Sequence, residues 1–147
     1  MKTYQIKPRE VARQWYLIDA AQAPLGRVST QAASLLIGKS KPNLTSHVDG
    51  GDYVIVINAS QLVVTGAKRT NKKYYRHSGY PGGLRTRSLD EEIQSDPARV
   101  IIKSIKGMLP DNKLRAGRLA RLKVYADSEH RHSGQQPTVV KLGKKGS

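Results

Sequence analysis

The stretch D-Y-V-I-V-I-N at residues 52–58 decides the fold, because four β-branched residues follow one another in it. Branched side chains favour extended backbone. A half-exposed strand would alternate apolar with polar residues, whereas this run contains no polar break. We therefore expect a strand of a parallel sheet covered by helices, with Val54 and Val56 on one face, Ile55 and Ile57 on the other, and all four buried.

Apolar segments on either side of this run predict the rest of the fold. Strands are expected at Trp15–Ala20, Leu62–Thr65 and Leu122–Ala126, and strand-like residues also occur at Lys73–His77. Helices are expected from Arg27 to a stop at Gly38, after an N-cap at Ser88, over Ala98–Leu109 behind Asp96-Pro97, and over Lys113–Arg121. Strands that alternate with helices predict a three-layer α/β domain.

The helix expected at Ala98–Leu109 has two different faces. Ile101, Ile102, Ile105 and Met108 lie toward one side, and Arg99, Lys103 and Lys106 line another. One face can therefore be buried while the other meets a ligand.

The length of 147 residues predicts a single domain. Residues 1–13 are expected to form an N-terminal arm, 14–126 the α/β core and 127–147 a basic C-terminal tail. Both termini are highly charged and poor in large apolar groups, so we expect them to be extended and poorly packed on the domain.

The chain contains no cysteine, which removes disulfides and thiolate metal sites. The N-terminus lacks the apolar stretch of a secretory signal, and no run approaches the length of a membrane span. We expect a soluble intracellular protein that does not bind membranes.

Charge indicates the class of partner. Twenty-six Lys and Arg against eleven Asp and Glu give a net charge of +15. A compact domain with this self-repulsion usually binds a polyanion, most often nucleic acid. No acidic residue occurs from Tyr53 to Leu89 or between Asp111 and Asp127, whereas a merely soluble surface would mix the two signs.

The most basic segment is K-K-Y-Y-R-H-S-G-Y-P-G-G-L-R-T-R at residues 72–87. Its cations can neutralise phosphates, its tyrosines can stack on unpaired bases, and its glycines let the backbone approach a ligand closely. One of the adjacent Tyr74 and Tyr75 is expected to point inward. The residues expected to bind RNA are Lys68, Arg69, Lys72, Lys73, Arg76, His77, Tyr80, Gly82, Gly83, Arg85, Arg87, Lys103, Lys106, Arg115, Arg118 and Arg121.

Two other patterns in the sequence match functional motifs only in part. The stretch A-S-L-L-I-G-K-S at residues 33–40 fits a loose phosphate-loop pattern, but it lies where a helix is expected to end rather than to begin. The groups His47, Asp49 and Asp52, and Glu129 and His132, lack the spacing of a zinc site. We expect neither a metal nor a catalytic centre.

The stretch Y-Y-R-H-S-G-Y-P-G-G-L at residues 74–84 resembles the signature of the bacterial L-thirteen family of large-subunit ribosomal proteins. The resemblance covers nearly the whole chain in order, through W-Y-L-I-D-A…P-L-G-R (15–27), H-V-D-G-G-D-Y-V-I-V-I-N-A (47–59), V-T-G-A-K (64–68), K-G-M-L-P (106–110), L-K-V-Y-A (122–126) and E-H…Q-Q-P (129–137). The sequence departs from the family pattern at residues 114–118, where Arg115 replaces an expected glycine and Gly117 follows two positions later. That departure leaves the backbone of this basic helix open.

The resemblance implies a three-layer α/β/α domain with a mostly parallel sheet of about four strands, basic loops and extended termini. It also implies a structural role on the large ribosomal subunit, bound to large-subunit rRNA of the 23S type and to neighbouring ribosomal proteins. No enzymatic activity, cofactor, small-molecule substrate or homo-oligomer is implied. The expected location is the cytoplasmic ribosome, with an organelle ribosome of bacterial descent left open.

Two other function classes remain as alternatives. One is a free RNA-binding or regulatory protein of the same fold, which would not sediment with ribosomal subunits. The other is a nucleotide-using α/β enzyme, whose ATP binding would depend on Lys39.

Overall fold

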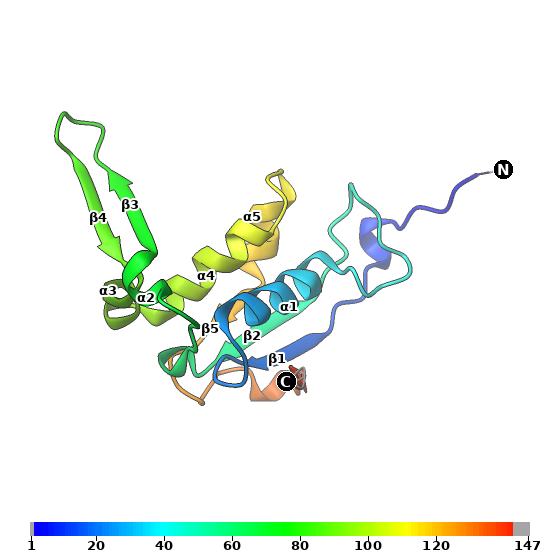
Figure 1. Cartoon of the computed structure of the whole chain (residues 1–147). Coiled ribbons are helices and arrows are strands. Elements are labelled where there is room, and N and C mark those ends of the chain that lie inside the picture. Colours follow the sequence, from blue (N-terminus) through cyan, green and yellow to red (C-terminus); the bar gives the residue numbers. More distant parts are fainter. Residues whose placement is uncertain (1, 143–147) are drawn as a thin grey trace.

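The computed structural model describes residues 2–142, which form an α/β fold around a four-stranded sheet (Figure 1). The strands follow the order β5-β2-β1-β6, and every neighbouring pair is parallel. Their bounds are β1 (Trp15–Asp19), β2 (Tyr53–Ile57), β5 (Leu122–Val124) and β6 (Thr138–Val139). The mostly parallel sheet of about four strands is therefore confirmed.

The central strand β2 behaves almost as its sequence predicts. Val54, Ile55 and Val56 are fully buried. Ile57, the last residue of the strand, is only half-buried. The expectation that all four branched residues are buried thus holds for three of them.

Helices cover the face of the sheet that carries Val54 and Val56. The helix α1 (Leu25–Ile37) ends at Gly38, whose φ of 85° is the left-handed conformation that glycine adopts freely. The helix α4 (Pro97–Met108) begins behind Asp96, whose side chain accepts a hydrogen bond from the backbone N–H of Arg99. Both expected helix ends are confirmed, and α5 (Leu114–Ala120) is regular through Gly117 despite the departure from the family pattern.

The apolar face of α4 is narrower than its sequence predicts. Ile101 and Ile105 are fully buried, whereas Ile102 is 39% exposed and Met108 is 43% exposed. Ile102 follows Ile101 by about 100° around the helix axis and therefore points away from the sheet. Shorter elements complete the fold: η2 (Ala59–Gln61), α2 (Lys68–Asn71) and α3 (Leu89–Ser95), which is capped by Ser88 as expected.

The opposite face of the sheet is covered by the chain that follows β5. His132 stacks on Trp15, with ring centroids 5.1 Å apart, and its Nε2 lies 2.8 Å from the Tyr125 hydroxyl. The short η3 (Ser133–Gln135) follows at once. Helical segments therefore flank the sheet, in agreement with the three-layer α/β/α arrangement that the sequence predicts.

The fourth strand is not the expected one. Of Leu62–Thr65, only Val63 pairs, in a single bridge with Pro24. The sheet is completed instead by β6, which pairs with β1 and continues into a hydrogen bond from the Val140 N–H to the Leu17 carbonyl. The prediction that the C-terminal tail is poorly packed on the domain is thus partly wrong. Main-chain pairing to an open strand edge needs few large apolar side chains. Its last two lysines, Lys144 and Lys145, lie outside the described residues.

The N-terminal arm is largely exposed but attached at defined points. It contains the short η1 (Pro8–Glu10), and Ile6 is buried. Arg13 donates hydrogen bonds to the carbonyls of Gly51 and Asp49 at 2.6 and 3.0 Å. None of the helices within residues 2–142 combines the length and apolarity that crossing a membrane requires.

Candidate RNA interface

The basic segment folds into an antiparallel hairpin that projects away from the rest of the chain (Figure 1). Its strands are β3 (Lys73–His77) and β4 (Leu84–Ser88), with Lys73 opposite Ser88 and His77 opposite Leu84. The first strand was expected, whereas the second was not, because L-R-T-R-S carries a single large apolar residue. A two-stranded hairpin of this kind gains little from self-burial. Because the hairpin projects from the rest of the chain, most of its side chains are exposed and available to a ligand.

The loop at the tip of the hairpin depends on its glycines. Gly79 and Gly82 have φ values of 86° and 72°, in the region that other residues rarely adopt. A Cβ at Gly83 would lie 2.0 Å from the Ser78 hydroxyl, so this position has no room for a side chain. The tip is therefore tight, and it presents Tyr80, which is 76% exposed.

The two faces of the hairpin carry different chemistry, because side chains alternate along a strand. Tyr74 and Arg76 share one face with their partners Arg87 and Arg85. Lys73, Tyr75 and His77 occupy the other face. Tyr75 is 69% exposed, whereas Tyr74 is half-buried and packs against the hydrophobic core. The prediction that one of the adjacent tyrosines points inward is confirmed.

Tyr74 joins the base of the hairpin to the helices. The ammonium groups of Lys103 and Lys72 lie 4.6 and 5.4 Å from the centre of its ring. Burial, together with the nearby negative charge of Glu92, raises the pKa of the Tyr74 hydroxyl above its ordinary value. The phenol therefore stays protonated, and its ring acts as a support for two cations.

The segment 72–87 contains five cations. In the part of the chain that the structure describes, no carboxylate lies within 4.0 Å of the side-chain nitrogens of any of the five. Three other predicted cations do have such partners: Arg69 with Asp90 at 3.1 Å, Lys103 with Glu92 at 3.6 Å and Arg115 with Asp111 at 3.0 Å. The five unpaired cations are Lys72, Lys73, Arg76, Arg85 and Arg87.

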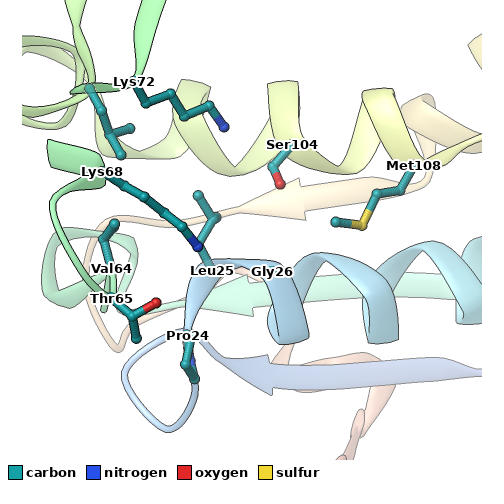
Figure 2. Close-up of a pocket in the computed structure, with 10 residues that line it drawn as sticks. Pro24, Leu25, Gly26, Val64, Thr65, Lys68, Lys72, Ser104 and Met108 are labelled. Atoms are coloured by element: carbon teal, nitrogen blue, oxygen red, sulfur yellow. The ribbon is translucent and has the colours of Figure 1, made fainter.

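Lys68 and Lys72 line a pocket of about 290 Å³ beside the start of α1. Figure 2 shows Lys68 reaching across this pocket toward Leu25, with Ser104 and Met108 on the opposite wall. The two lysines thus extend the basic surface from the hairpin toward the domain. Lys106 on α4 is exposed as well.

Arg118 and Arg121 are placed differently from the other predicted cations. Their side chains are only 3% and 8% exposed, and both face Asp49. Arg121 also donates to the carbonyls of Asp52 and Leu36, at 2.7 and 3.1 Å. Burial lowers the pKa of the Arg121 guanidinium, against the opposing effect of Asp49. The two arginines are thus buried structural cations, and they do not belong to the exposed cations that are predicted to bind RNA.

The sequence does not predict this buried network, since His47, Asp49 and Asp52 are considered there only as metal ligands. The one available signal is the three-residue spacing of Arg118 and Arg121, which places both on one side of a helix. Asp52 is also occupied, by Lys41 at 2.8 Å and by the Gln14 N–H at 3.0 Å. Within residues 2–142, no cluster of three His, Cys, Asp or Glu side chains could hold a metal ion.

The phosphate-loop pattern at residues 33–40 also has the wrong geometry. Its first five residues form the last turns of α1, and Gly38 ends that helix. Lys39 and Ser40 therefore follow the carbonyl end of a helix, where no free N–H groups point at a phosphate.

Comparison with known proteins identifies the family of the chain. Residues 13–131 match the family described as ribosomal protein L13. The large ribosomal subunit protein uL13 of Kocuria rhizophila is 54% identical over 137 residues, which are 93% of each chain. The proteins of the same name from Micrococcus luteus and Neisseria gonorrhoeae are 49% and 53% identical, over 98% and 97% of this chain and 98% and 99% of theirs. The chain belongs to the ribosomal protein L13 family.

Proposed function

We propose that this chain, acting as a single domain, is a structural constituent of the large ribosomal subunit that binds large-subunit rRNA and helps to organise it during assembly. The observation that carries the proposal is the projecting hairpin, whose five unpaired cations lie in a stretch without acidic residues. Family membership supports the ribosomal setting, since the relatives are named as large-subunit proteins.

The hairpin and the adjoining helices form the RNA interface. Exposed cations neutralise backbone phosphates, and each such contact makes binding more sensitive to salt. His77 and Tyr80 meet sugars or bases, and the loop backbone at Gly82 and Gly83 lies against the RNA. The proposed interface comprises Lys68, Arg69, Lys72, Lys73, Arg76, His77, Tyr80, Gly82, Gly83, Arg85, Arg87, Lys103, Lys106 and Arg115.

The proposed role is to hold RNA in place rather than to transform a substrate. The RNA is of the 23S type, and neighbouring large-subunit proteins contact the remaining surface of the domain. One copy binds per subunit. The cytoplasmic ribosome is the proposed location.

Two measurements test this function. A tagged copy in bacterial cells should sediment with large ribosomal subunits, whereas a free RNA-binding regulator would remain in the lighter fractions. In vitro, affinity for deproteinised bacterial large-subunit rRNA should fall with salt. Changing Lys72, Lys73, Arg85 and Arg87 to Gln should reduce the logarithmic salt slope by about 0.7 to 0.9 for each phosphate that is no longer neutralised. An unchanged slope in a folded variant would contradict the proposed interface.

A further inference from the structure

A groove separates the inner face of the hairpin from the helices α3 and α4. It encloses about 180 Å³. Arg76, Arg85 and Arg87 line it from the hairpin, Arg99 and Lys103 from α4, and Glu92 from α3. Residues far apart in the sequence are thus brought to one concave site.

The groove is strongly cationic. Five cations against one carboxylate leave it with a formal charge of 5 − 1 = +4. Glu92 is almost fully buried and lies 3.6 Å from Lys103, so it is already engaged. Within residues 2–142, none of the four arginines has a carboxylate within 4.0 Å.

Tyr74 also lines this groove. Its ring supports Lys103, and its hydroxyl oxygen is buried without a hydrogen-bond partner among the described residues. A hydrogen bond from a buried hydroxyl to an acceptor is stabilising. The groove therefore combines arginine N–H groups with an unused O–H donor, and its one carboxylate, Glu92, is already paired with Lys103.

We propose that this groove seats a phosphodiester of the rRNA backbone, gripped between the hairpin and α4. The inference rests on the proposed function and assigns separate roles to the two faces of the hairpin. Arginine forks match the paired oxygens of a phosphate, whereas a lysine offers only a point charge. The inner face, together with Arg99, holds the backbone, and the outer face with Tyr75 and His77 meets sugars and bases.

The groove is tested by a double substitution that keeps its charge but replaces two planar guanidinium groups by ammonium groups. In Arg87→Lys/Arg99→Lys the net charge is unchanged, but two guanidinium forks are removed. We expect its affinity for deproteinised bacterial large-subunit rRNA to fall by at least about tenfold, because each lost guanidinium fork removes a charged hydrogen bond, with the salt slope unchanged. The matched control is Arg9→Lys, the same substitution at an exposed position outside the proposed interface, which should bind as the unmodified protein does.

A second pair of variants separates this inference from the proposed function. Arg87→Gln/Arg99→Gln removes two charges inside the groove, and Lys73→Gln/Lys106→Gln removes two outside it. Circular dichroism and thermal unfolding confirm that each variant is folded. Weaker binding by both Gln variants, with Arg87→Lys/Arg99→Lys equal to the unmodified protein, would overturn the phosphate seat and leave the proposed function standing. Unchanged binding by every variant would overturn both.

Discussion

Arg121 forms an ion pair with Asp49 and so ties the C-terminal end of α5 to the turn that precedes β2. The same carboxylate lies 3.7 Å from Arg118 and 4.0 Å from Arg13. One acid therefore serves three arginines that come from the N-terminal arm and from α5. Asp49 thus joins the N-terminal arm to the end of α5.

Replacing Asp49 with Asn should lower the free energy of unfolding by about 3–5 kcal/mol, because Arg118 and Arg121 would remain buried without a counter-charge. Urea unfolding followed by circular dichroism measures the change. The matched control is Asp111→Asn, which removes an exposed carboxylate paired with Arg115 and should cost about 0.5 kcal/mol or less. Equal losses of stability in the two variants would show that burial of the network contributes nothing.

Acid should weaken the packing of the C-terminal segment on the sheet. Burial, aided by the positive charges of His130 and Lys123, lowers the pKa of His132 below its ordinary value. The unfolded chain therefore binds a proton more readily, so stability is complete above about pH 6.5 and is lost as the pH falls through the lower folded pKa. A neutral His132 can also accept the Tyr125 O–H, which a protonated ring cannot.

The measurement is the free energy of unfolding between pH 7.5 and pH 5, for the unmodified chain and for His132→Gln. The loss of stability toward low pH should be smaller in the variant. Parallel pH profiles would rule out His132 as its source.

Two glycine substitutions should have opposite effects on stability. A Cβ at Gly51 would lie 1.7 Å from the Leu36 carbonyl oxygen, so Gly51→Ala should destabilise the fold by about 3 kcal/mol or more. Gly107 lies on the exposed side of α4 with nothing within 4 Å, so Gly107→Ala should stabilise by about 0.5–1 kcal/mol. Thermal unfolding of both variants under one condition checks the signs. A neutral Gly51→Ala would contradict the close approach of these two segments.

Local patterns predicted the parts of the fold that local chemistry determines. The branched run at residues 54–57 indicated the central strand, and Gly38 and Asp96 marked helix ends through backbone conformation and capping. Alternation along β3 separated Tyr74 from Tyr75. Each of these features depends on residues within about one turn or one strand of each other.

Such local patterns do not predict which distant segments and side chains come together. The strand β6 has two residues and forms because the edge of β1 is open, so its own composition carries almost no signal. Arg118 looks the same in sequence as Arg115, although one is buried against Asp49 and the other is partly exposed beside Asp111. Which basic residues are available to RNA depends on where distant acids lie, and only the folded chain determines that.

Substitution of the three hairpin tyrosines should separate binding from stability. Tyr75 and Tyr80 are 69% and 76% exposed, so Tyr75→Ala and Tyr80→Ala should leave unfolding unchanged. Each should weaken binding to large-subunit rRNA by about 1–3 kcal/mol, the usual value of a ring stacked on an unpaired base. Tyr74→Ala should instead lower the unfolding midpoint, because its half-buried ring packs on the core and supports Lys103.

Filter binding at a fixed salt concentration, paired with thermal unfolding, gives both quantities for each variant. Tyr75→Phe and Tyr80→Phe serve as controls, since they keep the ring and should bind as the unmodified chain does. The outer face and the tip of the hairpin would have no role in stacking if the Ala variants kept full affinity. An equal fall in affinity in the Phe and Ala variants would assign the contact to the hydroxyl groups rather than to the rings.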